Sequence, residues 1–427
     1  MLFQQSLLPR FKSLLHNKTV KKGGLYAIFS FFNRGVSFVL LTILARYINP
    51  AEYGEFSLFN TVITFLGFIV GLSTEGYLSV SFFKATKEKF KEDFTAICLI
   101  TVSVSFVILL FFVLSSQWLT GVLKVPVKFL FLGLLLSFSK VFVNLNLDYY
   151  RVQEKLSWYG VLSCSFAILN FILAIYLVVG RDLNWHGQVY SLTTCSVFFA
   201  LIAIVIFSKN SLFRVSKSMA TYKSIILWGL PIIPHHASTW IKQGLDTYII
   251  EGTHSLADVG LFNFSMTLAG VIIIIGQAFN QTNSVNLYQT LSSEDTKENK
   301  LKNLQRKEKF LSLFYLIAVV SIMILVAIFI PIVMPKYTAC IPYFEILSIY
   351  GFLQCIYFLY CNYLFYYIST KQLMFITFGS SIIHVILSLF LTKYSLYLTA
   401  SIYVFTQVIV TSLVFIQSRK LIKEKLI

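Results

Sequence analysis

The stretch from residue 94 to residue 115, FTAICLITVSVSFVILLFFVLS, contains no charged side chain and is dominated by large apolar residues. A helix of about 20 such residues is long enough to cross the hydrocarbon core of a bilayer. Lipid admits only α-helices or closed β-barrels, and a barrel would show alternating segments of about ten residues. No such alternation is found, so this stretch predicts a membrane-spanning helix.

Similar stretches occur along the whole chain of 427 residues. Of these residues 57% are hydrophobic and only 12% are charged, whereas soluble domains carry about 25% charged residues. The sequence therefore predicts an all-α polytopic membrane protein. We expect twelve spans, at residues 24–46, 56–80, 94–115, 127–147, 158–180, 187–207, 225–250, 258–281, 311–331, 342–366, 373–392 and 397–417.

Positive charge is distributed unevenly over the connections between these spans. Of the 35 Lys and Arg residues, 26 lie in the N-terminal segment, the even-numbered connections and the C-terminal tail, and 6 lie in the odd-numbered connections. Because cationic segments stay in the cytoplasm, both termini are predicted to be cytoplasmic. Anionic lipids beside these segments account for the net charge of +17, so no nucleic-acid partner is expected.

Two sequence echoes indicate an internal repeat. Residues 51–56 (AEYGEF) match residues 257–262 (ADVGLF) at an offset of 206, and Tyr149–Tyr150 match Tyr366–Tyr367 at an offset of 217. The first and seventh spans start on the same side, so the repeat is parallel. We therefore expect two pseudo-symmetric six-helix lobes around a central cavity. The predicted segments are a cytoplasmic N-terminal segment 1–23, an N-lobe 24–207, an inter-lobe loop 208–224, a C-lobe 225–417 and a tail 418–427.

Charged residues inside the spans are the candidates for function. Arg34, Lys140 and Lys242 are the three cations that lie well inside apolar stretches. A cation in hydrocarbon costs roughly 3 kcal/mol or more, so each needs a watery cavity or a partner. We predict that they bind substrate in the cavity. The deep acids, Glu75 and Asp246, are candidates for ion coupling or charge pairing.

The sequence leaves two interpretations open for each acid. Lys242 and Asp246 are four residues apart and lie on one helix face, so they form either an ion pair or a proton-sensitive switch that releases the lysine. Glu75 and Lys140 are expected at similar depth. They are either partners in the bundle, or Glu75 is the ion-coupling carboxylate of the first lobe.

Two prolines, Pro231 and Pro234, remove backbone donors early in the seventh span. A kink or an unwound turn is expected there. It is either a static bend or a hinge.

Three stretches resemble polysaccharide flippases of the multidrug/oligosaccharidyl-lipid/polysaccharide exporter superfamily. They are residues 44–54 (LARYINPAEYG), residues 150–155 (YRVQEK), and the seventh span with its continuation, which contains residues 229–234 (GLPIIP) and 257–262. The resemblance covers nearly the whole chain. The family often has a proline near the end of span eight, and residues 280–286 contain none.

This resemblance implies a flippase that moves an undecaprenyl-pyrophosphate-linked oligosaccharide across the bacterial inner (plasma) membrane by alternating access. Such proteins serve O-antigen (lipopolysaccharide), capsule or exopolysaccharide assembly, and polysaccharide polymerase and assembly proteins are expected partners. Coupling to H⁺ or Na⁺ is a further possibility. The six cysteines contain no Cys-x-x-Cys pair, and neither metal nor organic cofactor is expected.

Three rival functions were compared. A cation-coupled multidrug exporter of the same superfamily would need a negative cavity for its cationic cargo, whereas the deep charges here are mostly positive. A lipid II flippase is chemically close but usually has further C-terminal spans. A membrane glycosyltransferase or polymerase would need catalytic residues in a sizeable external loop, and the predicted external loops are short. We therefore expect a transporter and not an enzyme.

Overall fold

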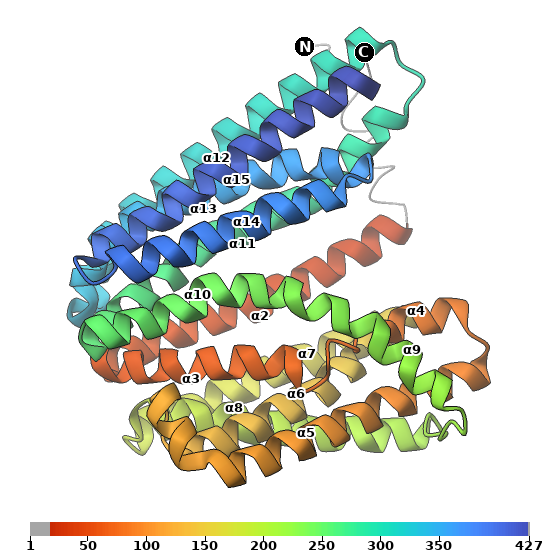
Figure 1. The fold of residues 1–427 in the computed structure, drawn as a ribbon, viewed down its shortest axis with the longest axis vertical. Coiled ribbons are helices and arrows are strands. Elements are labelled where there is room, and N and C mark those ends of the chain that lie inside the picture. The colour runs from red at the N-terminus through yellow and green to blue at the C-terminus, as the bar shows by residue number, and fades with distance from the viewer. Residues whose placement is uncertain (1–17, 426–427) are drawn as a thin grey trace. The chain divides into compact units, whose positions relative to one another are not determined.

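The computed structural model describes residues 18–425, apart from the side chains of residues 18–27, 30, 235, 238, 239 and 370. Within this range all regular secondary structure is helical, as Figure 1 shows, and no strand occurs among the described residues. The prediction of an all-α fold is confirmed.

Every predicted span overlaps a helix or a pair of helices, in the predicted order, although the second span, 56–80, is broken by turns at residues 70–76. These helices are α2 (Lys18–Tyr47), α3 (Pro50–Ile69), α5 (Lys87–Leu123), α6 (Val127–Val152), α7 (Leu156–Ile175), α8 (Asn184–Lys209), α9 (Met219–Gly229) with α10 (Ile233–Thr253), α11 (Leu256–Ser292), α12 (Lys297–Val333), α13 (Ile341–Tyr366), α14 (Thr370–Leu391) and α15 (Leu396–Lys425). A short helix, α4 (Tyr77–Lys84), follows α3.

Nine helices in the described part of the chain are long and apolar enough to cross a membrane. Three of the predicted spans are not among these nine helices: α2, α3 and the α9–α10 pair. Each of the three contains charged residues, either within the predicted span or at the start of the helix. Arg34 lies in α2, Glu52 and Glu55 lie near the start of α3, and Lys242 and Asp246 lie in α10. The chain is a multi-pass membrane protein.

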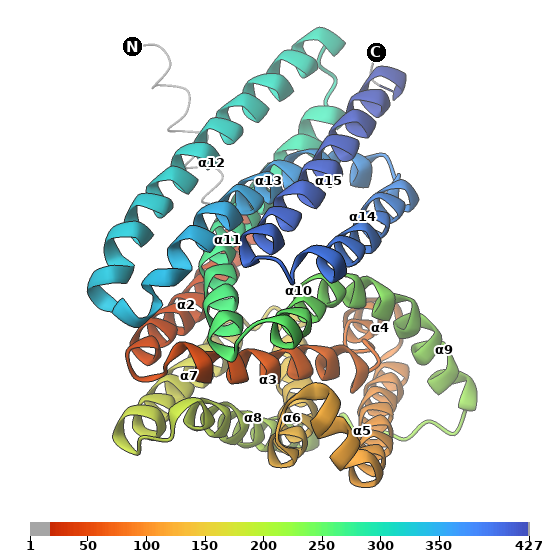
Figure 2. The same cartoon turned by 60° about the vertical axis from the view of Figure 1, so that its left-hand side comes forward.

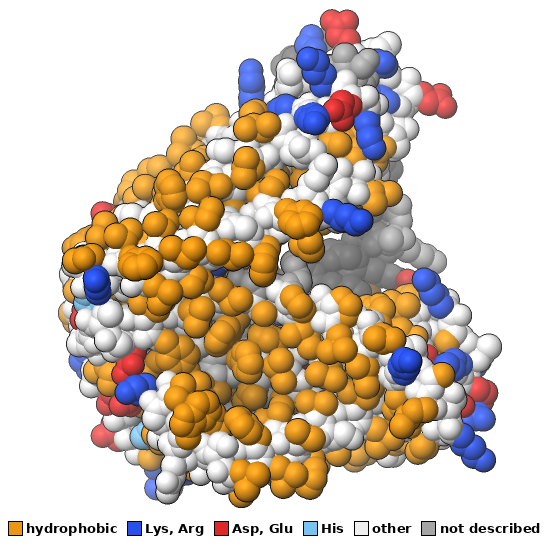
Figure 3. All heavy atoms as spheres, viewed as in Figure 1, with side chains coloured by type: hydrophobic (Ala, Val, Ile, Leu, Met, Phe, Trp, Pro, Cys, Tyr) orange, Lys and Arg blue, Asp and Glu red, His pale blue; other side chains and the backbone are white. Residues whose placement is uncertain are grey.

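Large apolar side chains point outward over long stretches of helix. Leu114 on α5 is 85% exposed and Ile332 on α12 is 72% exposed. Contiguous exposed apolar surface marks contact with lipid or with a partner. Figure 3 shows hydrophobic side chains along the sides of α12 and its neighbours, and charged side chains at the end where α12 begins and α15 finishes. This is the surface expected of helices in a bilayer.

The chain divides into two compact units. Unit 1 comprises residues 1–47 and 59–237, and unit 2 comprises residues 48–58 and 238–427. Figures 1 and 2 show the helices of each unit packed side by side. The division passes through α3 and through the first turns of α10, so each of these two helices contributes to both units.

In unit 1, the connection after α8 is tied to the start of α5 by polar contacts. Arg214 forms an ion pair with Glu88, and its backbone N–H donates to the Thr95 hydroxyl at 2.7 Å. The Lys89 ammonium lies 3.1 Å from the buried Asp93 carboxylate and donates to the Thr221 hydroxyl at 2.6 Å. These contacts hold the segment between α8 and α9, and the start of α9, against α5.

In unit 2, the helix starts of α3 and α11 are built in the same way. Asn49 and Glu52 exchange backbone-to-side-chain hydrogen bonds of 2.8 and 2.9 Å at the start of α3. Ser255 and Asp258 do the same at the start of α11, at 3.1 and 3.2 Å. Both are capping boxes, and the two pairs are separated by the repeat offset of 206 residues. The matched caps support the equivalence of residues 51–56 and 257–262.

The equivalent glycines of the repeat, Gly54 and Gly260, meet each other where α3 crosses α11. A Cβ on Gly54 would lie 2.1 Å from the Leu256 carbonyl oxygen, and a Cβ on Gly260 would lie 1.8 Å from the Pro50 carbonyl oxygen. The contact is reciprocal, because Pro50 and Leu256 are also 206 residues apart. Only glycine lets two helix backbones approach this closely.

An aromatic cluster packs next to this crossing. The Tyr53 ring makes edge contacts with Phe264 and Tyr337, at centroid distances of 5.5 and 6.1 Å. The Tyr337 hydroxyl donates to the Ile48 carbonyl at 3.0 Å. These buried contacts explain why residues 48–58 belong to unit 2.

The charged segment between the eighth and ninth predicted spans is helical. Helix α11 continues to Ser292, and the segment from Lys297 is the beginning of α12. Residues 297–330 contain no glycine or proline, so nothing in the sequence stops the charged turns from continuing into the apolar ones.

Candidate functional site

The predicted site residues lie in both units. Arg34 is exposed on α2, and Lys140 is partly buried on α6. Glu75 lies in the turn after α3, where its carboxylate oxygen is 3.2 Å from the position a Cβ on Gly71 would occupy. Among the described residues, Glu75 and Lys140 form no ion pair. The structure does not bring the two charges of this predicted pair together.

Lys242 and Asp246 are one turn apart on α10, and each has a different partner on α14. The Lys242 ammonium donates to the Ser380 hydroxyl at 3.1 Å. The Asp246 carboxylate contacts His384 Nε2 at 2.9 Å. Both contacts join residues 138 positions apart, so two consecutive turns of α10 face two consecutive turns of α14. The suggested Lys242–Asp246 ion pair is not formed.

Asp246 and His384 are buried within unit 2. Asp246 is 1% exposed and His384 is not exposed at all. The second carboxylate oxygen of Asp246, Oδ1, is buried and has no hydrogen-bond partner among the described residues. A buried acceptor without a donor is costly, and the cost is greatest when the group is ionised.

Helix α15 completes the surroundings of this pair. The other imidazole nitrogen, His384 Nδ1, lies 3.2 Å from the Thr406 hydroxyl. The Tyr403 ring meets the imidazole edge to face at 4.5 Å, and the Tyr403 hydroxyl donates to the Lys242 carbonyl at 3.1 Å. We call Lys242, Asp246, Ser380, His384, Tyr403 and Thr406 the unit 2 polar cluster.

Sequence reasoning missed His384, although a signal was present. An ionisable residue inside a predicted span is a functional candidate by default, and His384 lies in the middle of the span 373–392. Its pairing with Asp246 had no sequence signal, because the two residues are separated by 138 positions.

A structured turn lies where the two prolines predict a break. Leu230–Ile232 form a 3₁₀ turn between α9 and α10, with Pro231 at its centre. Pro234 follows in the first turn of α10, a position that tolerates a missing N–H. The hinge role of the two prolines remains a prediction.

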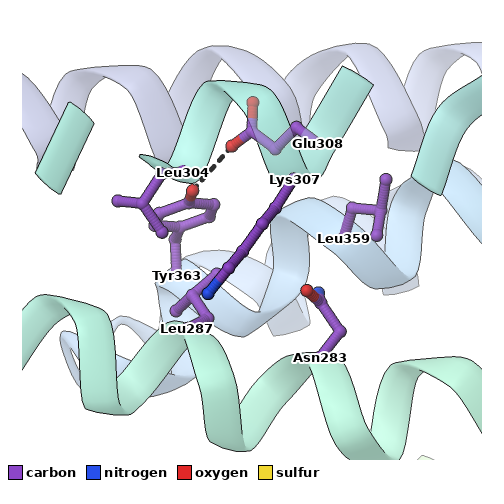
Figure 4. A pocket seen from close by; sticks show the side chains of 7 residues that line it. All are labelled: Asn283, Leu287, Leu304, Lys307, Glu308, Leu359 and Tyr363. Atoms are coloured by element: carbon purple, nitrogen blue, oxygen red, sulfur yellow. Dashed lines mark hydrogen bonds between the residues drawn. The ribbon is translucent and has the colours of Figure 1, made fainter. Parts of the chain in front are cut away.

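A small pocket elsewhere in unit 2 lies between α11, α12 and α13. In Figure 4 the Lys307 side chain runs across it, and the Tyr363 hydroxyl donates to Glu308 at 2.6 Å. Lys307 also donates to Thr290 at 3.4 Å, and Arg419 forms an ion pair with Glu308. The one acid of this pocket, Glu308, is compensated by Arg419, so we assign the pocket a structural role.

Comparison with known proteins connects this architecture to one superfamily of transporters. The chain superimposes on a MATE family multidrug resistance transporter of the MOP superfamily with a TM-score of 0.74 and 14% identity, over 91% of this chain and 94% of the other. It superimposes on the lipid II flippase MurJ with a TM-score of 0.71 and 13% identity, over 92% and 87%. The protein therefore has the fold of MOP-superfamily transporters.

Two further comparisons bear on function. A MOP-superfamily transporter from Pyrococcus furiosus, described as having a binding pocket of reverse polarity that suggests a different function, matches with a TM-score of 0.65 and 13% identity, over 94% and 96% of the two chains. An uncharacterized membrane protein of Haemophilus influenzae is 25% identical over 375 residues, 86% of this chain and 88% of its own. No family model matches the sequence.

Proposed function

We propose that this protein is a flippase that carries an anionic lipid-linked oligosaccharide, of the undecaprenyl-pyrophosphate type, across a bacterial inner membrane by alternating access. O-antigen, capsule and exopolysaccharide repeat units are the cargo class. The observation that carries the proposal is the state of the three cations within the spans: Arg34, Lys140 and Lys242 form no ion pair with any acid among the described residues.

Uncompensated cations in spanning helices are suited to an anionic cargo. Each such charge is costly in hydrocarbon, and the cost falls when water or an anion neutralises it. The guanidinium of Arg34 presents a planar fork that binds phosphate oxygens in pairs, while a lysine ammonium supplies a point charge. The acid nearest to Lys242 along the chain, Asp246, is engaged by His384.

The fold comparisons support transport and leave the cargo open. One superfamily contains both multidrug transporters and a flippase of lipid II, so the fold alone does not distinguish cationic from anionic cargo. The reverse pocket polarity described for the Pyrococcus furiosus transporter agrees with the idea that pocket charge follows function in this fold. We therefore base the choice of an anionic cargo on the charges and not on the fold.

Ligand binding to the purified protein in detergent tests this proposal. Farnesyl pyrophosphate is a soluble polyprenyl diphosphate, and ethidium is a cationic drug. We expect the protein to bind farnesyl pyrophosphate, and Arg34→Gln or Lys242→Met to weaken that binding by about tenfold, as expected for a lost charge-assisted contact. The control Lys302→Gln changes an exposed lysine of α12 and should leave binding unchanged.

The same experiment distinguishes the rival function. Binding of ethidium without binding of farnesyl pyrophosphate would replace the flippase by a multidrug exporter. Loss of diphosphate binding in Lys302→Gln to the same extent as in Lys242→Met would show that the cations act only through the general charge of the protein.

A further inference from the structure

We infer that Asp246 and His384 form a proton-binding site in unit 2, and that its occupancy controls how strongly the neighbouring Lys242 binds an anion. The anion is the diphosphate of the proposed cargo, so this second part rests on the proposed function. The first part, the proton site itself, rests on the geometry of the unit 2 polar cluster alone.

The hydrogen bonds of Thr406 determine which imidazole nitrogen carries a proton. The Thr406 hydroxyl donates to the Ile402 carbonyl at 2.8 Å, so its single hydrogen is already used. With the hydroxyl hydrogen in this shortest contact, the Thr406 oxygen accepts at the His384 contact and Nδ1 donates. This assigns the N–H of the imidazole to Nδ1.

With Nδ1 protonated, the contact of 2.9 Å between His384 Nε2 and Asp246 Oδ2 needs a proton of its own. Two lone pairs at this distance would repel each other. The proton sits either on Nε2, which gives an imidazolium and a carboxylate, or on Oδ2, which gives a neutral imidazole and a neutral carboxylic acid. Both forms have a net charge of zero and differ only in the position of one hydrogen.

Loss of that proton to solvent leaves the pair with a net charge of −1. The imidazole must then move its remaining hydrogen to Nε2, and Thr406 must either turn its hydroxyl from Ile402 to Nδ1 or leave Nδ1 unpaired. In addition, Oδ1 of Asp246 has no donor among the described residues, so a carboxylate would be only partly stabilised. We infer that this arrangement is the proton-loaded one, in which Thr406 keeps its hydrogen bond to the Ile402 carbonyl.

Charged and titratable groups surround the pair on the helices packed against it. On α10, Lys242 is one turn from Asp246. On α15, the Tyr403 ring meets His384 edge to face and Tyr403 also interacts with Asp246. On α13, Tyr350 contacts the Tyr403 ring at a centroid distance of 5.4 Å. Lys242 is the one cation among these neighbours, and its partner Ser380 is neutral.

The charge of the pair therefore sets the net charge that Lys242 presents. Without the proton, the pair compensates the ammonium and the cluster is neutral. With the proton, the ammonium is uncompensated and the cluster carries a charge of +1. Proton binding and anion binding consequently strengthen each other, by the same factor in both directions. Site couplings of this kind amount to between about 5-fold and 150-fold.

The coupling is tested by measuring the affinity for farnesyl pyrophosphate between pH 5.5 and pH 9 in the full-length protein. We expect the wild type to lose about tenfold or more in affinity where the pair loses its proton. Asp246→Asn is neutral at every pH and should remove this part of the dependence while it retains binding. The titration of the ligand itself is common to all variants and cancels in the comparison.

Asp258→Asn is the matched control, because Asp258 caps α11 on the same unit and takes no part in the cluster. It should keep the wild-type pH dependence. The measurement is repeated in sodium and in choline salts. A dependence on sodium that disappears in Asp246→Asn would overturn the proton assignment in favour of a sodium site. Identical pH curves for the wild type and Asp246→Asn would overturn the coupling.

A measurement without ligand separates this inference from the proposed function. Imidazole nitrogen NMR of protein labelled on histidine, with His384→Gln to assign the signal, reports the protonation of each ring nitrogen. We expect His384 to carry a hydrogen on Nδ1 at pH 7. A neutral ring protonated only on Nε2 would overturn the proton site. If the proton site is found but no diphosphate binds, the proposed cargo is wrong and the proton site stands.

Discussion

Glu308 is a buried acid at the end of unit 2 where charged side chains gather, and it is 8% exposed. It receives a hydrogen bond of 2.6 Å from Tyr363 and an ion pair from Arg419. The guanidinium of Arg419 also lies over the Tyr360 and Phe415 rings, at 5.4 and 5.0 Å. Three helices, α12, α13 and α15, are joined through this one carboxylate.

Removing Arg419 should therefore destabilise the protein more than removing a surface lysine nearby. We expect Arg419→Met to lower the free energy of unfolding by about 2–3 kcal/mol, because it leaves a largely buried carboxylate with one donor fewer. Lys420→Met removes half of an exposed pair with Glu424 and should cost at most about 0.5 kcal/mol. Thermal unfolding in detergent measures both, and equal losses would contradict the structural role of Glu308.

At the same scale, the partners of the buried charges were the least predictable feature. The sequence indicated that Lys242 and Asp246 share a helix face, which they do. It did not indicate that Ser380 and His384 would be opposite them. A spacing of four residues is a local property of one helix, whereas the partner depends on which helix packs against that face.

At the scale of elements, the crossing of α3 and α11 depends on two glycines. The sequence repeat identified Gly54 and Gly260 as equivalent positions, and the structure explains why both are glycine. Each glycine packs against the first residue of the other helix. The carbonyl oxygen of that residue fills the space that a side chain would need.

Gly54→Ala and Gly260→Ala should each destabilise the protein by about 3 kcal/mol or prevent its accumulation, since the added methyl would overlap backbone atoms that cannot move independently. The chain provides a matched control on each helix. A Cβ on Gly67 of α3 or on Gly270 of α11 meets no atom within 4 Å, so those alanine variants should unfold at the wild-type temperature or above it. Detergent-solubilised protein and size-exclusion chromatography after heating give the comparison. Similar losses in all four variants would show that the crossing is not specially tight.

The long helices are a second feature of this scale. Helices α11 and α12 contain 37 residues each and are about 55 Å long at 1.5 Å per residue, whereas the hydrocarbon core is about 30 Å thick. Their excess length lies where α12 is charged, with six Lys or Arg and two Glu between Lys297 and Lys309. The hydrophobic pattern located the apolar part of each helix. It could not show that the charged turns from Lys297 to Lys309 belong to the same helix.

At the scale of the whole molecule, the alternation of charge over the connections predicts the orientation in the membrane. Lys217 lies in the exposed segment between α8 and α9, and Lys124 lies in the exposed segment between α5 and α6. In a background without native cysteines, Lys217→Cys should react with an impermeant maleimide only after the cells are permeabilised. Lys124→Cys should react in intact cells. The opposite pattern would invert the predicted topology.

The amino-acid pattern alone predicts the class of protein, the approximate positions of the spans and the charges available for function. These predictions rest on properties that a residue and its neighbours carry in any fold: the cost of transferring side chains into lipid and the preference of cationic segments for the cytoplasm.

Only the tertiary structure decided how those residues are used. It showed that α10 and α14 bring Asp246 to His384, that α15 orients the imidazole through Thr406, and that α3 meets α11 at two glycines. The physical reason is that such contacts join residues 22 to 206 positions apart. They depend on the rotation and packing of whole helices, and in membranes this packing follows side-chain shape more than hydrophobicity.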